Sequence, residues 1–465
     1  MKSCITHCGC EFYGAASPPL LCKLETIQNS ALRIALGAFK SSPISAIQAE
    51  SSLPSLSHRR SSLHVRTYTK LASSPNCHAL HTFLLHQGRE PLHGPLPYQA
   101  HTPFVDRALS FFATLRFIPP SFLTQEKTSH VGLWFPLSSL VTVSLPTQWS
   151  KGACPARGRT IFNTFIHTQY NNTFNIYTDG SRIPFPPSVG AAVYIPSKSL
   201  ATAWRLPDTA SILTAELFAI REGLTFATTL PPCAVTLFSD SLSALQLLSR
   251  HRPHTHHSLV FSIHLLLLRL LSSGFSPHLQ WVPSHIGVVG NTVADKAAAE
   301  AHSHPSPITL QTDQTDLLTL LKTAYIQHWD RLLTDSLQNT TLRRYRQDTR
   351  PHWWTHSPSR ALDTAVTRLR IGHTRLNHHL YRLRLAPDPF CPWCPNQLDT
   401  AEHLLLHCPR HHSHRTVLLQ SLTALHIPRP TLSDLLGGSQ DPGLAFKTLK
   451  NTRTFLKKTG QLQRI

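Results

Sequence analysis

The order of strand-like and helix-like segments between residues 172 and 303 constrains the fold of this chain more than any other feature. Short runs rich in β-branched, aromatic and aliphatic residues predict five strands, at residues 174–178, 189–195, 201–205, 234–239 and 278–282. Longer runs with apolar residues at helical spacing predict four helices, at residues 212–227, 242–249, 259–271 and 291–301. The first three strands have no helix between them and can pair antiparallel, whereas helices separate the last two, which would add in parallel. The sequence therefore predicts an α/β fold with a mixed five-stranded sheet, three strands antiparallel and two parallel, flanked by helices.

Four acidic residues stand where these strands end or where a helix faces the sheet. Asp179 ends the first strand, Asp240 ends the fourth, Glu216 lies on the first helix and Asp295 on the last. Strand ends of an open α/β sheet are where ligands bind. Each acid alone has an ordinary explanation, as a turn residue, a helix cap or a solvated helical side chain. The four together, in this order and on these elements, are far more specific than any one of them.

Carboxylates in such a group suit the hydrolysis of a phosphodiester. That reaction needs an activated water and neutralised charge on the phosphate and the leaving oxygen. Two hard divalent cations about 3.5–4 Å apart can supply both. Mg²⁺ prefers carboxylate oxygens, and bound cations relieve the mutual repulsion of clustered acids. We therefore expect a site for two ions of Mg²⁺ or Mn²⁺.

The segment at 172–303 resembles the ribonuclease H domain of non-LTR (LINE-like) retrotransposon polyproteins. The matching motifs, in the family's order, are YTDGS at 177–181, TAEL at 214–217, SDS at 239–241 and WVPSHIGVVGNTVAD at 281–295. The resemblance implies four metal ligands, and these are Asp179, Glu216, Asp240 and Asp295. It also implies that His285 is the family's mobile histidine, which assists proton transfer or product release.

The resemblance further implies the reaction and its substrate. The family cuts the RNA strand of RNA–DNA hybrids endonucleolytically, leaving 5′-phosphate and 3′-hydroxyl ends, and would recognise ribose through its 2′-hydroxyl group. This sequence departs from the family in a proline-rich loop at 182–188 and in lacking a basic protruding helix, so the residues that bind nucleic acid stay unknown. Two alternatives remain open, a catalytically inactive nucleic-acid-binding remnant and a scaffold that only uses the fold.

A compact group of cysteines and histidines near the C-terminus predicts a second metal site. Cys391, Cys394, His403 and Cys408 have the spacing C-x2-C-x8-H-x4-C, which suits a tetrahedral zinc ion. Free thiols and imidazoles in a His-rich tail are the plain alternative. His407, His411 and His412 are competing ligands. The spacing resembles the CCHC-type zinc motif that ends many of these retrotransposon proteins.

Charge and targeting signals limit which partners and which cell compartment we expect for this chain. The chain has 44 Lys and Arg against 24 Asp and Glu, a net charge of +20, which favours a nucleic-acid partner. The start, MKSCITHCGC, has no apolar core of a secretory signal. The most apolar run, residues 261–271, is far shorter than the roughly 20 residues of a membrane span. We expect an intracellular protein, cytoplasmic or nuclear, not secreted and without a membrane partner.

The flanks extend this interpretation. Residues 27–60 resemble the end of the reverse transcriptase thumb, yet no F/Y-x-D-D motif is present, so we expect a C-terminal fragment of a longer polyprotein that does not polymerise DNA. The basic stretch 341–370, with Trp353 and Trp354, would either bind a nucleic-acid backbone or form a solvated face over a local core. The predicted segments are a thumb remnant (1–65), a connecting region (66–171), the ribonuclease H domain (172–303), a basic helical linker (304–385), the zinc module (386–412) and a tail (413–465).

Overall fold

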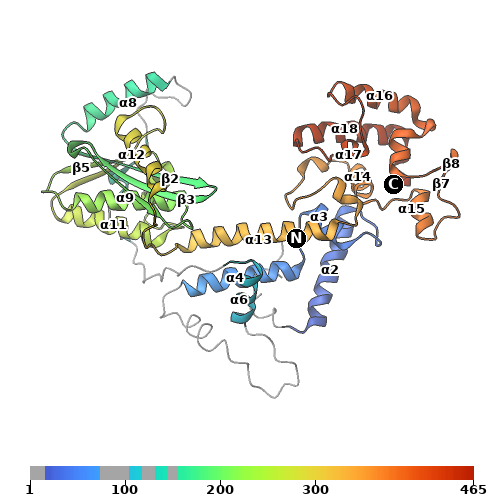
Figure 1. Cartoon of the computed structure of the whole chain (residues 1–465), viewed down its shortest axis with the longest axis horizontal. Coiled ribbons are helices and arrows are strands. Elements are labelled where there is room, and N and C mark those ends of the chain that lie inside the picture. The colour runs from blue at the N-terminus through green and yellow to red at the C-terminus, as the bar shows by residue number, and fades with distance from the viewer. Residues whose placement is uncertain (1–15, 74–103, 118–130, 145–154) are drawn as a thin grey trace, which may run out of the picture. The chain divides into compact units, whose positions relative to one another are not determined.

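The computed structural model describes residues 16–73, 104–117, 131–144 and 155–465 (Figure 1). The chain divides into two compact units, residues 65–322, and residues 1–64 together with 323–465. Part of the predicted connecting region lies outside the described residues. Its described parts form α6 (Phe104–Thr114), α7 (Leu137–Leu140), β1 (Val141–Thr142) and α8 (Pro155–Gln169). The finer segment boundaries stay a prediction.

A six-stranded mixed sheet forms the centre of the 65–322 unit. Its strand order is β1-β6-β5-β2-β3-β4, with β2 (Phe174–Pro184), β3 (Pro187–Ile195), β4 (Leu200–Leu206), β5 (Ala234–Ser239) and β6 (Ser276–Trp281). Strands β2, β3 and β4 pair antiparallel, and β2, β5, β6 and β1 pair in parallel. The predicted mixed α/β fold is confirmed. The prediction of five strands is one short, because β1 has only two residues and leaves no alternating pattern in the sequence.

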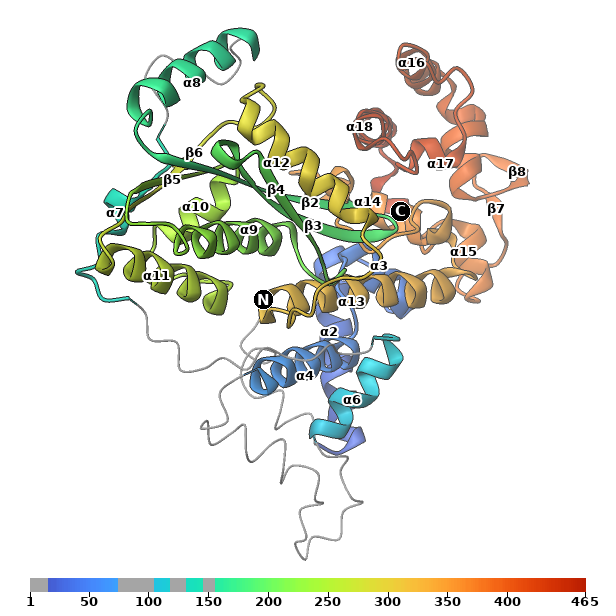
Figure 2. The ribbon, with the colours of Figure 1, turned by 60° about the vertical axis from the view of Figure 1, so that its left-hand side comes forward.

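Helices cover both faces of this sheet (Figure 2). On one face lie α9 (Ile212–Ala227), α10 (Leu242–Leu248) and α11 (His257–Ser272), whose aliphatic side chains form the largest core with β2, β5 and β6. On the other face lies α12 (Val289–Glu300), and α8 contributes Phe162 to a smaller core with Tyr177 and Phe238. Both layers bury apolar side chains of the sheet, so the strands that carry the predicted site residues are held from two sides.

One glycine sets how closely α12 approaches the sheet. A Cβ atom at Gly190 in β3 would overlap the backbone carbonyl oxygen of Ala298 in α12. Backbone on both sides leaves no flexible side chain that could move away. The close approach of helix and strand therefore requires glycine at this position.

The second unit is largely helical. Its elements are α2 (Pro18–Leu36), α3 (Ile44–Ser51), α14 (Arg360–Ile371), α15 (Asn377–Arg382), α16 (His412–Thr423), α17 (Leu432–Leu435), α18 (Pro442–Thr459) and the hairpin of β7 (Phe390–Cys391) and β8 (Cys394–Leu398). Two helices, α4 (Leu56–Ala72) and α13 (Gln314–Leu337), each continue from one unit into the other. Side chains from both ends of the chain share one core, and Arg370 forms a buried ion pair with Glu50 at 2.7 Å. Within the described ranges, no helix has both the length and the apolar character that crossing a membrane requires.

Candidate active site and metal centre

Two of the predicted acids lie side by side because their strands are parallel neighbours. Thr178 of β2 is in register with Ser239 of β5, and this is the last paired position of the two strands. Asp179 and Asp240 each follow that position, so both leave the sheet at the same edge. Asp179 was expected to end its strand, but β2 continues to Pro184 because its antiparallel pairing with β3 extends beyond the site.

Glu216 reaches the same place from α9. One carboxylate oxygen each of Asp179, Glu216 and Asp240 lies within 4.8 Å of the other two. The helix comes this close because position 180 is glycine. A Cβ atom at Gly180 would stand 3.0 Å from the backbone nitrogen of Glu216, tighter than an ordinary contact. The glycine of the YTDGS motif thus makes room for the glutamate.

Asp295 lies on α12 next to this group without being part of it. It is half-buried and outside the three acids that gather within 4.8 Å, yet its charge raises the pKa of each of them. One turn earlier on α12, the buried Asn291 donates a hydrogen bond from Nδ2 to Oδ2 of Asp240 at 3.1 Å. We did not predict a role for Asn291. The available signal was its position four residues before Asp295, which puts both side chains on one helix face.

The electrostatics of the group favour a bound cation. Burial, with the negative charges of Asp240 and Asp295, raises the pKa of Asp179 to about 8. Burial and the charges of Asp179 and Asp240 raise the pKa of Glu216 well above its ordinary value. The Oε2 atom of Glu216 is buried and, among the described residues, has no hydrogen-bond partner. Hard oxygen donors that repel one another, with one buried oxygen left without a hydrogen-bond partner among the described residues, fit a divalent metal ion.

His285 lies on the loop between β6 and α12 that borders the group. It is exposed, its φ of 58° is in the left-handed region, and its charge lowers the pKa of Asp240. Gly287, with φ of 83°, follows in the same loop, and the side chain of Arg159 from α8 lies over it. An ionisable side chain that stands at the edge of the carboxylates and has solvent access is in place to exchange protons.

Residues 171–303 match the family model RNase H. The match covers β2 to β6, all four predicted acids and His285. No curated protein matches the chain. The RNase H match supports a nuclease, a hydrolase that binds nucleic acid, and members of that family usually need a divalent metal.

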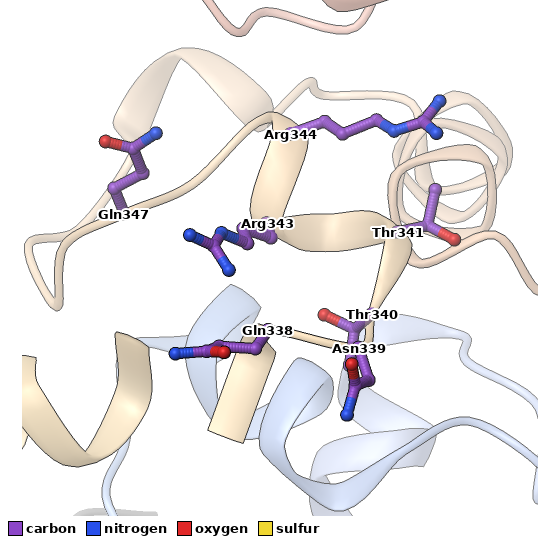
Figure 3. Close-up of a pocket in the computed structure, with 7 residues that line it drawn as sticks. All are labelled: Gln338, Asn339, Thr340, Thr341, Arg343, Arg344 and Gln347. Atoms are coloured by element: carbon purple, nitrogen blue, oxygen red, sulfur yellow. The ribbon is translucent and has the colours of Figure 1, made fainter. Parts of the chain in front are cut away.

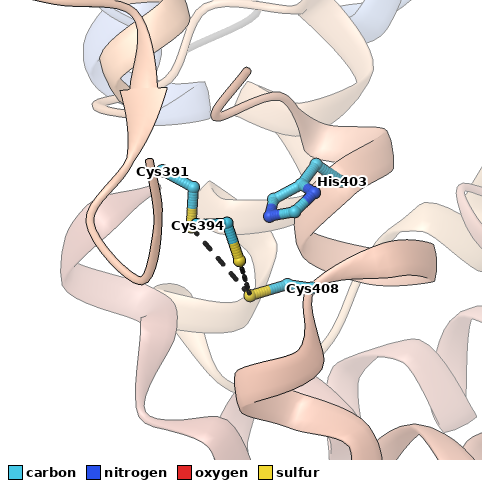
Figure 4. A group of neighbouring side chains, drawn as sticks. All are labelled: Cys391, Cys394, His403 and Cys408. Carbon is cyan, nitrogen blue, oxygen red and sulfur yellow. Dashed lines mark hydrogen bonds between the residues drawn. The ribbon is translucent and has the colours of Figure 1, made fainter. Parts of the chain in front are cut away.

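The second predicted metal centre lies outside the RNase H region. One ligand atom each of Cys391, Cys394, His403 and Cys408 lies within 4.8 Å of the other three (Figure 4). The Sγ atom of Cys408 is 4.0 Å from those of Cys391 and Cys394. Tetrahedral zinc with Zn–S bonds of about 2.3 Å would separate two sulfurs by about 3.8 Å. The four side chains therefore fit one metal ion. The competing histidines at 407, 411 and 412 are not in the group.

Local backbone contacts shape this cluster. The hairpin of β7 and β8 sets Cys391 opposite Cys394, and a short π-helical turn, His403–His407, leads to Cys408. The buried guanidinium of Arg415 donates to the carbonyl oxygens of Leu405 and Cys408 at 3.0 and 2.7 Å. The Nε2 atom of His403 is buried without a hydrogen-bond partner among the described residues, so this nitrogen is available as a metal ligand.

The two tryptophans of the basic stretch, Trp353 and Trp354, differ in how they pack. Trp354 stacks on His352, with ring centroids 4.3 Å apart, and its Nε1 atom donates to the carbonyl oxygen of Gly437. Trp353 is 57% exposed and contacts Phe446. The interpretation as a local core suits Trp354, whereas Trp353 keeps a free face.

Proposed function

We propose that residues 171–303 hydrolyse the RNA strand of RNA–DNA hybrids endonucleolytically, with two Mg²⁺ or Mn²⁺ ions held by Asp179, Glu216, Asp240 and Asp295. The observation that carries the proposal is the meeting of three carboxylates within 4.8 Å, inside a segment that matches the RNase H family. Asp295 stands close enough to shift the pKa of all three. The products would carry 5′-phosphate and 3′-hydroxyl ends.

Each of these residues has a defined task in that reaction. Bound divalent metal would supply an activated water and charge neutralisation at the phosphate. Asp179 and Asp240 project from adjacent parallel strands, so the sheet fixes their spacing. Asn291 orients the Asp240 carboxylate through its hydrogen bond to Oδ2. His285 would carry a proton between the site and solvent, since it is exposed and lies on a loop that contains Gly287.

Cleavage of an RNA–DNA hybrid labelled on the RNA strand tests this proposal. With Mg²⁺, the full chain should cut the RNA strand and leave the DNA strand intact. Asp240→Asn should abolish cutting, because asparagine keeps the size but loses the charge that holds a cation. Asp208→Asn is the matched control, because Asp208 is an exposed acid of the same unit that forms a surface ion pair with Arg205. If Asp240→Asn cuts as fast as the parent, the assignment is wrong. If the parent binds hybrid but does not turn it over at saturating metal, the inactive remnant is the correct alternative.

We further propose that Cys391, Cys394, His403 and Cys408 bind one Zn²⁺ ion that holds the β7–β8 hairpin against the turn at His403–His407. Three thiolates and one imidazole are a common ligand set for structural zinc. The sulfur distances of 4.0 Å and the buried Nε2 atom of His403 support it. Metal analysis of the purified chain should find about one zinc per chain in this site, and none in a variant with all three cysteines replaced.

We also propose that the chain derives from a non-LTR retrotransposon and acts inside the cell, in the cytoplasm or the nucleus. The support is the family-like order of the four motifs and the thumb-like sequence at 27–60. A clustered set of free cysteines suits a reducing compartment. Sequencing of the source locus tests the origin. A polymerase segment in the same reading frame would support it, and an unrelated coding region would contradict it.

A further inference from the structure

Two adjacent arginines of the second unit, Arg343 and Arg344, differ from those arginines of the unit that form ion pairs. Arg370, Arg453 and Arg464 each pair with an acid, at Glu50, Asp363 and Asp399. By contrast, neither guanidinium of Arg343 or Arg344 forms a hydrogen bond or ion pair with any residue that the structure describes.

The backbone beneath these two arginines is fixed. They lie in a short 3₁₀ helix, Thr341–Arg344. Leu342 within this helix and Tyr345 directly after it are buried in the core of the unit. The carbonyl oxygen of Arg344 accepts a hydrogen bond from Oγ of Ser433 at 3.2 Å. Two charged side chains are thus held exposed on a rigid base, which lowers the entropy cost of binding a ligand there.

These arginines line a cavity of about 580 Å³ where α13 ends (Figure 3). The other lining residues are Gln338, Asn339, Gln347 and two threonines, so the lining contains no acidic and no apolar side chain. Figure 3 shows the guanidinium of Arg343 between the amides of Gln338 and Gln347. Guanidinium, amide and hydroxyl groups together form a surface of hydrogen-bond donors with positive charge.

We propose that this cavity binds phosphate groups of a polynucleotide backbone, away from the carboxylates that would cut it. Planar guanidinium groups match the geometry of phosphate oxygens, and neutral amides add donors without a competing charge. The volume exceeds what a single phosphate needs and suits one phosphate with its adjoining sugars. The choice of a polynucleotide over a free phosphate rests on the proposed function, and on a chain with net charge +20.

Fluorescence anisotropy with a labelled RNA–DNA hybrid, and with labelled single-stranded RNA, tests the proposal. The full chain carries Asp240→Asn and is used without added Mg²⁺ and without a chelator, so that cleavage does not interfere and the proposed zinc site of the same unit stays intact. Arg343→Gln combined with Arg344→Gln should weaken binding most at low salt, because each lost phosphate contact removes about 0.9 from the salt slope on a duplex. The ratio of variant to parent Kd should therefore fall about threefold to tenfold between 50 and 200 mM salt, for one or two lost contacts.

A matched control removes two positive charges elsewhere in the same unit. Lys447 and Lys450 are exposed residues of α18 and do not line the cavity, so Lys447→Gln with Lys450→Gln should leave the Kd and the salt slope close to the parent's. Two variants that change the charge of the cavity lining in opposite directions strengthen the test. Gln338→Lys adds a cation to the lining and should tighten binding, whereas Gln347→Glu should weaken it.

Several results would overturn the proposal. One is an arginine variant that binds like the parent, or that loses no more than the lysine control. Another is displacement of the hybrid by poly-glutamate as readily as by unlabelled RNA, since that would mean a general acidic ligand. Inorganic phosphate that binds the cavity while the arginine variant leaves hybrid affinity unchanged would identify free phosphate as the ligand and also refute it. Failure of the cleavage proposal and failure of the cavity proposal are distinguishable, because cleavage depends on Asp240 and Mg²⁺, whereas this binding is measured with Asp240 replaced and without added Mg²⁺.

Discussion

Replacement of Asp179 by asparagine should stabilise the metal-free protein. Asp179 is only 5% exposed, and burial together with the charges of Asp240 and Asp295 raises its pKa from an ordinary 3.8 to about 8. The folded chain therefore holds more protons than the unfolded chain between about pH 4 and pH 8. Stability of the metal-free state then falls as the pH rises through that window, by about 1.4 kcal/mol per pH unit for one such group.

The size of the effect follows from these pKa values. At pH 7 the difference from 3.8 is about three pH units, which corresponds to about 4 kcal/mol of stability lost relative to acid conditions. Asparagine removes this cost, because it carries no charge and its amide can donate to Asp240 as a protonated Asp179 would. For a unit of this size, 4 kcal/mol corresponds to a rise in Tm of roughly 10 °C.

Differential scanning calorimetry, run without and then with added Mg²⁺, measures this prediction. The transition of interest is the one that Mg²⁺ shifts in the parent chain. Asp179→Asn should raise the Tm of that transition at pH 7, flatten its pH dependence and abolish its response to Mg²⁺. Asp208→Asn should change none of these. An Asp179→Asn variant that melts at or below the parent's temperature at pH 7 would show that the carboxylates do not repel one another as the structure implies.

Three further outcomes follow from the structure. Gly190→Ala should lower the free energy of unfolding by about 1–3 kcal/mol, because the added Cβ atom would overlap the carbonyl oxygen of Ala298. Urea unfolding measures this change, and unchanged stability would mean that α12 does not pack so closely on β3. Acid should destabilise the second unit by up to about 3 kcal/mol between about pH 6.5 and pH 4. Burial and the charge of His328 lower the pKa of His58 to about 4, so the unfolded chain binds a proton in this range that the folded chain does not. His58→Phe should remove this pH dependence of stability, and a pH dependence that persists in the variant would contradict the prediction. A chelator should release about one zinc per chain and lower the Tm of the second unit, an effect that Cys408→Ser should reproduce without a chelator and that Cys233→Ser should not.

The sequence predicts the sheet and most of the site because the relevant signals are local. Strand and helix patterns span fewer than about 20 residues, and the pairing of parallel neighbours then brings Asp179 and Asp240 to one edge. The cysteine and histidine spacing likewise defines its own cluster, since all four ligands lie within one short segment.

Other features depend on contacts that no local pattern encodes. Glu50 and Arg370 are 320 residues apart in the chain, so nothing near either residue predicts that the N-terminal helices share a core with the C-terminal third. Strand β1 has only two residues and is recognisable as a strand by its pairing with β6. The role of Asn291, and the lack of a partner for the Arg343 guanidinium among the residues that the structure describes, become visible only when the neighbours of each side chain are known.

The most direct test of the carboxylate centre is single-turnover cleavage of an RNA–DNA hybrid by Asp179→Asn, at saturating Mg²⁺ and under conditions where calorimetry shows the variant folded. The account predicts a loss of at least roughly a thousandfold in cleavage rate, because the same charge that destabilises the metal-free protein is needed to hold the metal. A folded variant that cuts the RNA strand within about tenfold of the parent's rate would contradict it.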